Sequence, residues 1–329
     1  MNAEREPARS RFLPAFVLIP ILAAMAGLFA GSYSFAMAHP TPHRVPIGVV
    51  DEAPAVDPFL TRLDAGLSTQ LEEHRFATRD AAVAAVERQH IFAVLQAGPG
   101  GRGVTLELVP AAGASVARVL AAAAPGAAAQ AGVPLTVTSL KPLQPGDPQG
   151  LAIFYITLAA IIIGFVGSGQ LSLHAPALRP LERIAAIVAF SVLGGFAICA
   201  VVDWGLHVLR LPFWESWGIL TLTMVTSALV FTMFHILCGR WAILPTWALM
   251  VLLGNPSSGG AVSWPLLPQP LGAIGRWLPP GASVNAQHNA IYFYGHQYAF
   301  PFLVLIGWAL LAVVVFWTWR YRSRPRTSS

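Results

Sequence analysis

The sequence predicts an α-helical polytopic membrane protein with six transmembrane helices and an α/β extracytoplasmic domain inserted between the first and second of them. Two observations predict this class. Apolar residues make up 55% of the 329 residues, whereas soluble globular proteins average about 45–50%. Charged residues are also unevenly distributed, because residues 150–319 carry only eight and residues 39–149 carry eighteen. A helical region embedded in lipid, with one aqueous domain inserted near its beginning, is the simplest explanation of both.

Six apolar segments account for the membrane region. A bilayer core about 30 Å thick requires about 20 apolar residues of helix. The candidate spans are residues 12–37, 151–173, 184–204, 217–237, 241–253 and 300–319. The fifth has only 13 residues, including Pro245, so its helix would be about 20 Å long and would need a neighbouring stretch to complete the crossing.

Arginines predict the orientation of the chain. Ten arginines lie in the two termini and in the loops after the second and fourth spans, and only Arg210 and Arg276 lie in the loops on the other side. Cytoplasmic loops carry the excess of basic residues. We therefore expect a multi-pass protein of the cell (plasma) membrane with both termini in the cytoplasm. The expected parts are the N-terminus (1–11), the first helix (12–38), the outer domain (39–149), a five-helix membrane domain (150–320) and a basic cytoplasmic tail (321–329).

The same charges bear on partners. The basic residues sit at membrane edges instead of on one folded face, so nucleic acid is not an expected partner. Membrane lipid is an expected partner, because a basic residue near an anionic surface contributes about 1 kcal/mol.

The first apolar segment has two interpretations. The sequence Ala-Met-Ala at 36–38 resembles a signal-peptidase site, and a cleaved chain with five crossings satisfies the arginine distribution equally well. The apolar run of 27 residues is longer than the usual signal-peptide core of about 7–15, which favours a retained helix. Ala23, Gly27 and Gly31 form a small-residue stripe, which predicts close packing of this helix against another.

The inserted domain has the pattern of a small α/β fold. We expect strands at 45–50, 91–95, 104–109 and 135–143, where β-branched residues concentrate. We expect helices at 58–75, after a cap at Asp80, and at 115–123, where Pro125 ends the pattern.

The stretch 254–299, between the fifth and sixth spans, contains six prolines and one charged residue, Arg276. It is too apolar for a free loop, so we expect a re-entrant or surface-lying segment. It begins with the strongest local motif of the chain, which consists of Gly254, Asn255, Pro256, Ser257, Ser258, Gly259 and Gly260. Asparagine before proline, two hydroxyls and three glycines predict a rigid, buried turn that ends the fifth helix and is a candidate functional element.

Enzymatic chemistry is not expected. The single lysine, Lys141, is flanked by Leu140 and Pro142, so a phosphate-binding Gly-x-x-x-x-Gly-Lys loop is absent from the sequence. The sequence also has no His-Glu-x-x-His, Cys-x-x-Cys or Gly-x-Ser-x-Gly motif. We predict no catalytic residue, no metal site and no cofactor.

Five more residues are candidates for a binding or interfacial role, namely Asp203, His207, Glu215, Tyr292 and Tyr294. The first three fall at the outer ends of helices, where they either anchor the helix at the interface or line a substrate path. The two tyrosines crowd the entrance of the last span. They belong either to an aromatic belt at the lipid headgroups or to a hydrophobic substrate portal.

The motif at 254–260, followed by Leu267-Pro268, by residues 278–281 and by Tyr292-Phe293, resembles the membrane part of the YhgE/Pip (phage infection protein-like) group and the related DUF3533 proteins, within the ABC-2 type permease class. The layout is similar too, with one helix, an outer domain whose first strand resembles residues 47–52, and five helices. The resemblance implies a permease-like subunit of efflux or envelope-associated transport without catalysis of its own.

The resemblance also sets the expected function, which is export of a hydrophobic or amphipathic compound across the cell membrane by a homo- or hetero-oligomer. The cytoplasmic loop 174–183 is short and contains two prolines, so a separate ATPase subunit would meet only a small coupling element. The alternative is an envelope receptor or scaffold, phage-infection-protein-like or a secretion accessory, with no transport activity.

Overall fold

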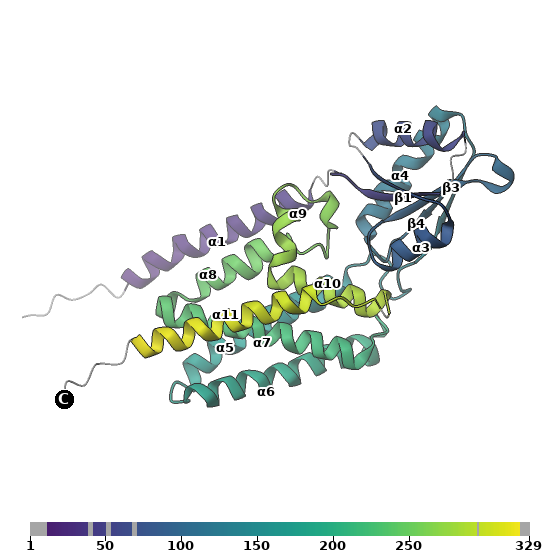
Figure 1. Cartoon of the computed structure of the whole chain (residues 1–329). Helices are drawn as coiled ribbons and strands as arrows, with labels where there is room; N and C mark the ends of the chain where they lie inside the picture. Colours follow the sequence, from purple (N-terminus) through teal and green to yellow (C-terminus); the bar gives the residue numbers. More distant parts are fainter. Residues whose placement is uncertain (1–11, 39–41, 51–53, 68–70, 295, 323–329) are drawn as a thin grey trace, which may run out of the picture.

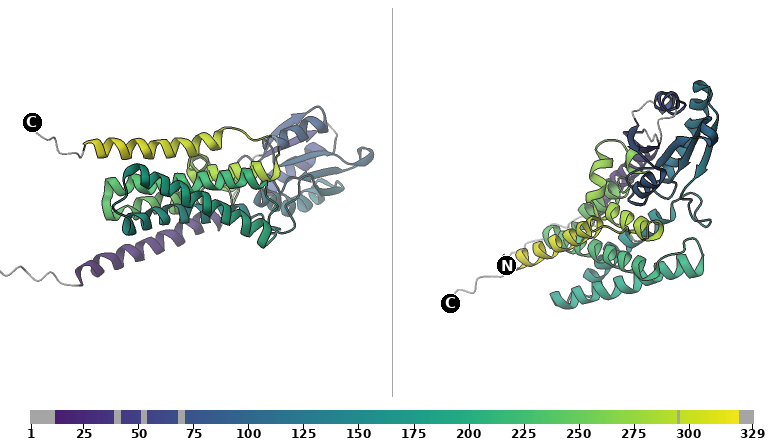
Figure 2. Two further views of the ribbon diagram at one scale, coloured as in Figure 1. Left: turned by 90° about the horizontal axis from the view of Figure 1, so that it is seen from below. Right: turned by 45° about the vertical axis from the view of Figure 1, so that its right-hand side comes forward.

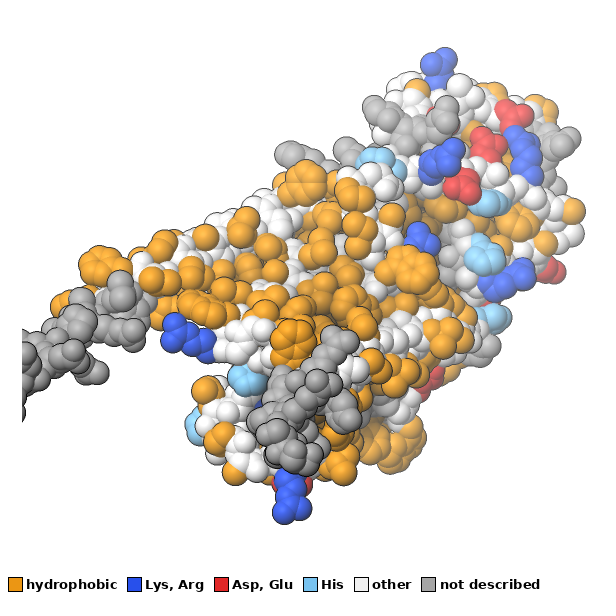
Figure 3. Space-filling model, turned by 60° about the vertical axis from the view of Figure 1, so that its left-hand side comes forward, with side chains coloured by type: hydrophobic (Ala, Val, Ile, Leu, Met, Phe, Trp, Pro, Cys, Tyr) orange, Lys and Arg blue, Asp and Glu red, His pale blue; other side chains and the backbone are white. Residues whose placement is uncertain are grey.

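The structure is a computed structural model that describes residues 12–38, 42–50, 54–67, 71–294 and 296–322. It consists of long helices that run side by side and a small α/β domain at one end of them (Figure 1). Hydrophobic side chains cover the helical part on the face shown in Figure 3, whereas charged side chains gather on the α/β domain. The polytopic helical class and the small sheet agree with the prediction. The segments 1–11 and 323–329 lie outside the described residues, so the structure does not test their location.

Five helices in the described part of the chain are long and apolar enough to cross a membrane. They are α1 (Leu13–Met37), α5 (Ala152–His174), α6 (Pro180–Cys199) with its π-helical extension η2 (Ala200–Gly205), α7 (Phe213–Cys238) with η3 (Gly239–Trp241), and α11 (Phe300–Arg322). The expected fifth span consists of α8 (Ile243–Trp247) and the π-helical η4 (Ala248–Gly254), which together form a shorter apolar helix. By length and composition, five of the six expected spans are therefore shown, and the sixth stays a prediction.

Helix α7 is the centre of the membrane domain. It packs against α5, α6 and α11, and its polar side chains hydrogen-bond to those neighbours. Ser227 donates to the carbonyl oxygen of Ile161 at 2.7 Å, and Thr226 donates to that of Leu305 at 3.2 Å. Such interhelical bonds contribute about 0.6–2 kcal/mol each where the hydrophobic effect does not distinguish lipid from leucine. They therefore specify which helices α7 contacts.

Helix α1 stands apart from the other helices. Its apolar window has no buried residue, and only its last turns approach η4 (Figure 2). A Cβ atom added at Gly27 or Gly31 would meet no neighbouring atom within 4 Å. The described helices of the chain therefore leave the stripe of Ala23, Gly27 and Gly31 uncovered, and its packing against another helix stays a prediction.

The outer domain is built on a five-stranded sheet with the order β2-β1-β3-β4-β5. The strands are β1 (Pro46–Val50), β2 (Glu72–Phe76), β3 (Ala93–Ala97), β4 (Val104–Leu108) and β5 (Leu135–Ser139). Strand β1 is parallel to β2 and β3, while β4 is antiparallel to β3 and parallel to β5. Helices α2 (Val56–Leu67) and α4 (Ala114–Ala131) cover the face of Ile47 and Val49, and α3 (Arg79–Glu87) covers the face of Val50.

The helix expected at 58–75 is wrong in its second half. Helix α2 ends at Leu67, and residues 72–76 form the edge strand β2. Leu71 continues the helical spacing of leucines, but its backbone N–H donates to Asp64 Oδ1 at 2.7 Å, so the chain turns back. An edge strand tolerates the charged sequence Glu-Glu-His-Arg because most of its side chains stay exposed to water.

Two helix boundaries also differ from expectation. The cap of α3 is Thr78, whose hydroxyl accepts from the N–H of Ala81 at 3.2 Å, and not Asp80. Helix α4 continues through the exposed Pro125 and ends at Gly132, which has a φ of 68°. The free energy gained by packing α4 on the sheet therefore exceeds the cost of the backbone hydrogen bond that the proline removes.

The stretch after the motif folds back onto the helices as predicted for a segment that is not a free loop. It contains η5 (Trp264–Leu266), α9 (Leu271–Ile274), η6 (Gly275–Trp277) and α10 (Pro279–Tyr292). Pro279 and Pro280 begin α10, where the missing N–H groups cost nothing. Nearly all of α10 is buried between the outer domain and α5, α7 and α11 (Figure 1). This helix therefore forms the junction between the two parts of the protein.

Candidate functional site

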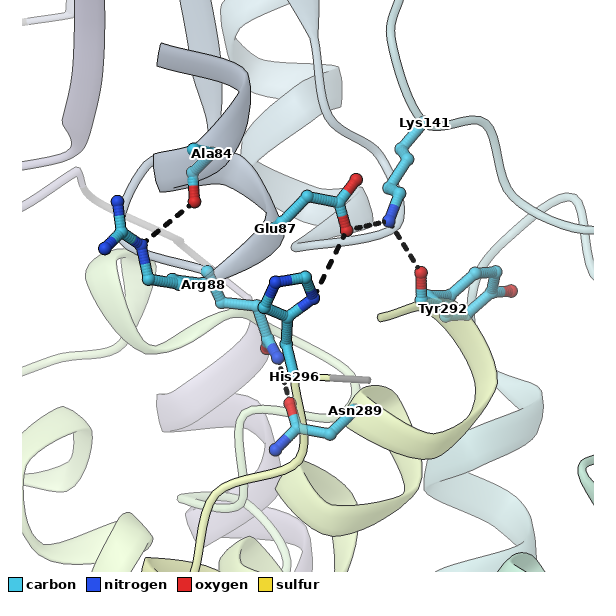
Figure 4. Close-up of polar contacts among 8 residues, drawn as sticks. Ala84, Glu87, Arg88, Lys141, Asn289, Tyr292 and His296 are labelled. Carbon is cyan, nitrogen blue, oxygen red and sulfur yellow. Dashed lines mark hydrogen bonds and ion pairs between the residues drawn. The ribbon is translucent and has the colours of Figure 1, made fainter. Parts of the chain in front are cut away.

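The described part of the chain concentrates its polar contacts between the two parts of the molecule at α10. Lys141, in the segment after β5, is the main link (Figure 4). Its Nζ donates to Glu87 Oε2 at 2.5 Å and to the backbone carbonyl of Tyr292 at 2.9 Å. Nζ also lies 4.4 Å from the centre of the Phe293 ring. The negative end of the α10 dipole, an aromatic face and a carboxylate therefore share one cation, which fixes the end of α10 to the outer domain.

Further hydrogen bonds join the parts. The side chain of Gln89 donates to Asn289 Oδ1. The Ser115 hydroxyl donates to Ser263 Oγ at 2.9 Å and accepts from the Ser263 N–H at 2.9 Å. His288 Nδ1 lies 3.3 Å from the carbonyl oxygen of Ala111, and because a carbonyl can only accept, Nδ1 carries the proton.

The surroundings of His288 in this junction favour the neutral form of its ring. Burial lowers its pKa, and the Ala111 carbonyl and the charge of Asp147 oppose that shift without reversing it. Asp147 itself is buried and accepts from the N–H groups of Leu151 and Ala152 at 3.0 Å each, so it caps the first turn of α5. With Nδ1 protonated, Nε2 of His288 is an acceptor.

A cavity of about 550 Å³ lies next to these contacts. Its walls come from the end of α3, the segment 259–264, one face of α10 and the segment 296–298. The lining residues are Arg88, Gln89, His90, Phe92, Ala112, Gly259, Ser263, Trp264, Val284, Asn285, His288, His296, Gln297 and Tyr298. This volume is within the about 300–1,000 Å³ of small-molecule sites, so the cavity is a candidate ligand site.

The cavity has a polar, exposed rim and a buried floor. Arg88, His90 and His296 are exposed, whereas Val284 and Asn285 on α10 are buried. Apolar surface is supplied by Phe92, Trp264, Val284 and the Tyr298 ring. Asn285 Nδ2 donates to the Tyr298 hydroxyl at 2.5 Å, which leaves the hydroxyl proton of Tyr298 free to donate. Such a cavity is suited to a ligand with one polar end and one apolar end.

The 254–260 motif contributes Gly259 to the wall of this cavity. Six of its residues are buried and Gly259, which is half-buried, lines the cavity directly. Gly259 has a φ of 82°, and an added Cβ would lie 2.7 Å from the Trp264 ring. The Ser257 hydroxyl donates to the Leu253 carbonyl at 2.7 Å and so closes the end of η4. The motif is buried and turns where predicted, and its side chains make mainly backbone contacts.

A close backbone approach holds the motif against the segment 264–292 that follows it. A Cβ added at Gly275 would overlap the carbonyl oxygen of Ser257, and one added at Gly281 would overlap the carbonyl oxygen of Gly275. The Ser257 carbonyl also accepts from Trp264 Nε1 at 3.1 Å. Only glycine permits this approach, so Gly275 and Gly281 are part of the motif in space although they lie about 20 residues after it in the sequence.

Two of the five other candidate residues lie near the cavity. Tyr292 contributes its carbonyl to Lys141, and its hydroxyl accepts from the Gln144 N–H at 3.4 Å. Glu215 Oε1 accepts from the side chain of Gln297, a cavity residue, at 2.8 Å. Glu215 therefore supports the cavity wall from outside, whereas Tyr292 holds the end of α10.

The other three candidates do not line the cavity. Asp203 is half-buried in η2 and its carbonyl accepts from His207 Nδ1 at 2.7 Å, while His207 is exposed. Tyr294 is exposed as well. Trp204 and Trp214 are exposed near the same ends of α6 and α7, as in an aromatic belt at a membrane interface.

The sequence interpretation missed several junction residues. Gln89, Asn285, His288 and Asn289 are uncharged, so they carry no signal of intramembrane charge. Their sequence signal is a group of polar residues within an apolar stretch, which indicates a buried polar contact. Helix α10 contains Asn285, Gln287 and Asn289 among buried neighbours. The sequence interpretation used Lys141 only to exclude a phosphate-binding loop, although Lys141 is the single lysine of the sequence.

Comparison with known proteins adds no assignment. No family model matches the chain, and no curated protein or solved structure matches it either. The resemblance to the YhgE/Pip group stays a prediction. Among the described residues, no group of three or more histidine, cysteine, aspartate or glutamate side chains is placed to hold a metal ion.

Proposed function

We propose that this protein is an ABC-2 type permease-like membrane protein that takes part in export of a hydrophobic or amphipathic compound across the cell membrane. The observation that carries the proposal is the cavity between α10 and the outer domain. It lies where the apolar helices end, and it combines apolar surface with a polar, exposed rim. A compound that leaves the membrane for the aqueous side needs both apolar and polar surface at the outer ends of the helices.

The proposal includes six crossings. The short helix formed by α8 and η4 has 12 residues, about 18 Å at 1.5 Å per residue, so it falls short of a bilayer core of about 30 Å. The re-entrant segment from η5 to α10 packs beside its outer end and supplies the missing depth. The first residues of α1 and the last residues of α11 lie at the same end of the helices, away from the outer domain (Figures 1 and 2). An even number of crossings, with both termini cytoplasmic, is consistent with that arrangement.

The proposed energy source and assembly lie outside this chain. The sequence has no phosphate-binding loop, so ATP-driven export would need a separate ATPase subunit. Helices α5 and α6 are joined by a short turn at 175–179, which offers such a subunit a small surface. The uncovered stripe of α1 supports a homo- or hetero-oligomer, because small residues in membrane helices allow close approach of another helix.

Export is tested in cells that overproduce the protein, by the accumulation of a panel of lipophilic fluorescent dyes. We expect lower accumulation of at least one dye and recovery of accumulation in Ala112→Phe, which places a large ring in the cavity. Ala129→Phe, at an exposed position on α4, is the matched control and should behave like the unchanged protein. Equal accumulation in all strains, together with stable capture of an envelope protein by the outer domain, would support the receptor or scaffold alternative and refute export.

Topology is tested separately by cysteine labelling in a variant that lacks Cys199 and Cys238. A cysteine at Thr136, exposed on β5, should react with a membrane-impermeant maleimide in intact cells, whereas one at Ser328 should react only after lysis. Labelling of both in intact cells would refute six crossings.

A further inference from the structure

We propose that the junction cavity binds an amphiphile whose polar end carries a negative charge, such as a fatty carboxylate or the phosphate of a lipid headgroup. This inference rests on the proposed function in taking the cavity as the place where the exported compound binds, and it adds the charge of that compound.

The first argument is the sign of the lining charges. Of the described residues that line the cavity, Arg88 is the one with a permanent charge, and none is an aspartate or glutamate. His90, His288 and His296 add imidazoles to the same lining. A cationic ligand would therefore meet Arg88 without a compensating carboxylate, whereas an anionic ligand would meet a complementary charge.

The second argument is that Arg88 has no carboxylate partner among the described residues. Its Nε donates to the Ala84 carbonyl at 3.1 Å, within its own helix (Figure 4). The neighbouring carboxylate, Glu87, is already engaged by Lys141 at 2.5 Å and lies 4.0 Å from His296 Nδ1. The remaining N–H groups of the Arg88 guanidinium are free to donate to a carboxylate or phosphate, for which their planar arrangement is suited.

The third argument is the position of the apolar surface. Phe92, Trp264 and Val284 line the same cavity, and Val284 is buried on α10. Arg88 is exposed at the rim. A ligand with its anionic end at Arg88 can therefore place its hydrocarbon on these three side chains, which an anion without a hydrocarbon part, such as inorganic phosphate, cannot use.

Binding is measured on the full chain in nanodiscs of phosphatidylcholine, with a dansyl-labelled fatty carboxylate as probe. Energy transfer from tryptophan reports binding, because Trp264 lines the cavity. We expect saturable binding that is about tenfold weaker in Arg88→Gln, since a charge-assisted hydrogen bond to the headgroup is lost. Arg88→Lys should retain most of the affinity, and Arg102→Gln, an exposed arginine outside the cavity, should bind like the unchanged protein. The methyl ester of the probe should bind more weakly and be insensitive to Arg88→Gln.

Equal affinity for the acid and its ester, or an unchanged affinity in Arg88→Gln, would overturn the inference. Adding phosphatidylglycerol to the nanodiscs distinguishes the two sources of the anion. Competition that disappears in Arg88→Gln identifies a lipid headgroup, and absence of competition identifies a free amphiphile. The two proposals can also be refuted separately. If binding depends on Arg88 but no dye is exported, export alone is refuted. If Ala112→Phe blocks export but the acid and the ester bind equally, the preference for an anion alone is refuted.

Discussion

Replacing Gly275 by alanine should destabilise the helical part of the protein more than any other single methyl group that can be added to the segment 264–292. The added Cβ would overlap the carbonyl oxygen of Ser257 and lie 2.6 Å from its carbonyl carbon. The backbone on the other side leaves no room, because Gly281 already packs against the carbonyl of Gly275. One of the two segments must therefore move away from the other.

The cost has two parts. Overpacking of a filled interior costs about 1–3 kcal/mol, and here it acts on backbone atoms that cannot rotate away. Movement of the Ser257 carbonyl also weakens its hydrogen bond from Trp264, 3.1 Å long, which contributes about 1 kcal/mol. We expect a loss of about 2–4 kcal/mol in the free energy of unfolding.

Thermal unfolding in detergent can be followed with a dye that fluoresces when it reacts with a thiol, because Cys199 is buried and reacts only after unfolding. The exposed Cys238 is replaced by serine in all samples. Gly126→Ala is the matched control, since its Cβ would meet nothing within 4 Å inside α4, and alanine should stabilise that helix by about 0.5–1 kcal/mol. The two variants should shift the midpoint in opposite directions. A midpoint for Gly275→Ala at or above that of the unchanged protein would refute the close backbone approach.

Three further changes test the junction. Lys141→Met should cost about 1–3 kcal/mol and speed hydrogen exchange at the end of α10, because it removes one cation shared by three partners; unchanged exchange would contradict this link. Gly259→Val should lower stability or abolish function, because Gly259 has a φ of 82° and lies against the Trp264 ring. Ser257→Ala should have a small effect, since the hydroxyl bonds only to backbone. If Ser257→Ala abolished dye export while Gly259→Val exported normally, the hydroxyl would act on the substrate. His288, whose pKa is lowered by burial, takes up its proton more readily in the unfolded chain, so its contribution to stability is complete above about pH 6.5 and is lost as pH falls toward the depressed folded value. Unfolding midpoints measured across that range should fall less steeply in His288→Gln, and an equal slope would assign the pH dependence to other groups.

The sequence was informative wherever a local property decides the structure. Whether a helix prefers lipid depends on its own composition. The sequence therefore predicts the five long helices with boundaries within a few residues of those in the structure. The turn at 254–260 was also predictable, because asparagine before proline and repeated glycines restrict the backbone locally. The helix expected through 58–75 failed because leucine spacing does not reveal that β1 offers a free edge to residues 72–76.

The site depended on contacts between distant segments. Gln89 and Asn289 are 200 residues apart and meet only because α10 folds back under the outer domain. Likewise, no local pattern indicates that Arg88, Gly259 and His288 line one cavity, or that Glu87 is already paired with Lys141. Side chains of these types occur throughout protein sequences, so their role is recognised only from the residues that they contact.

The sequence by itself therefore determined that the chain enters a membrane, where its spans lie and where its backbone must turn, because transfer to lipid and backbone freedom are properties of single segments. Only the tertiary structure decided that α1 stays uncovered, that Gly275 packs closely against Ser257 and that a cavity with Arg88 at its rim lies beside the contacts between the outer domain and α10. These features arise from the packing of surfaces that are far apart in the chain, and the shape of such a surface is set by all the segments that contribute to it.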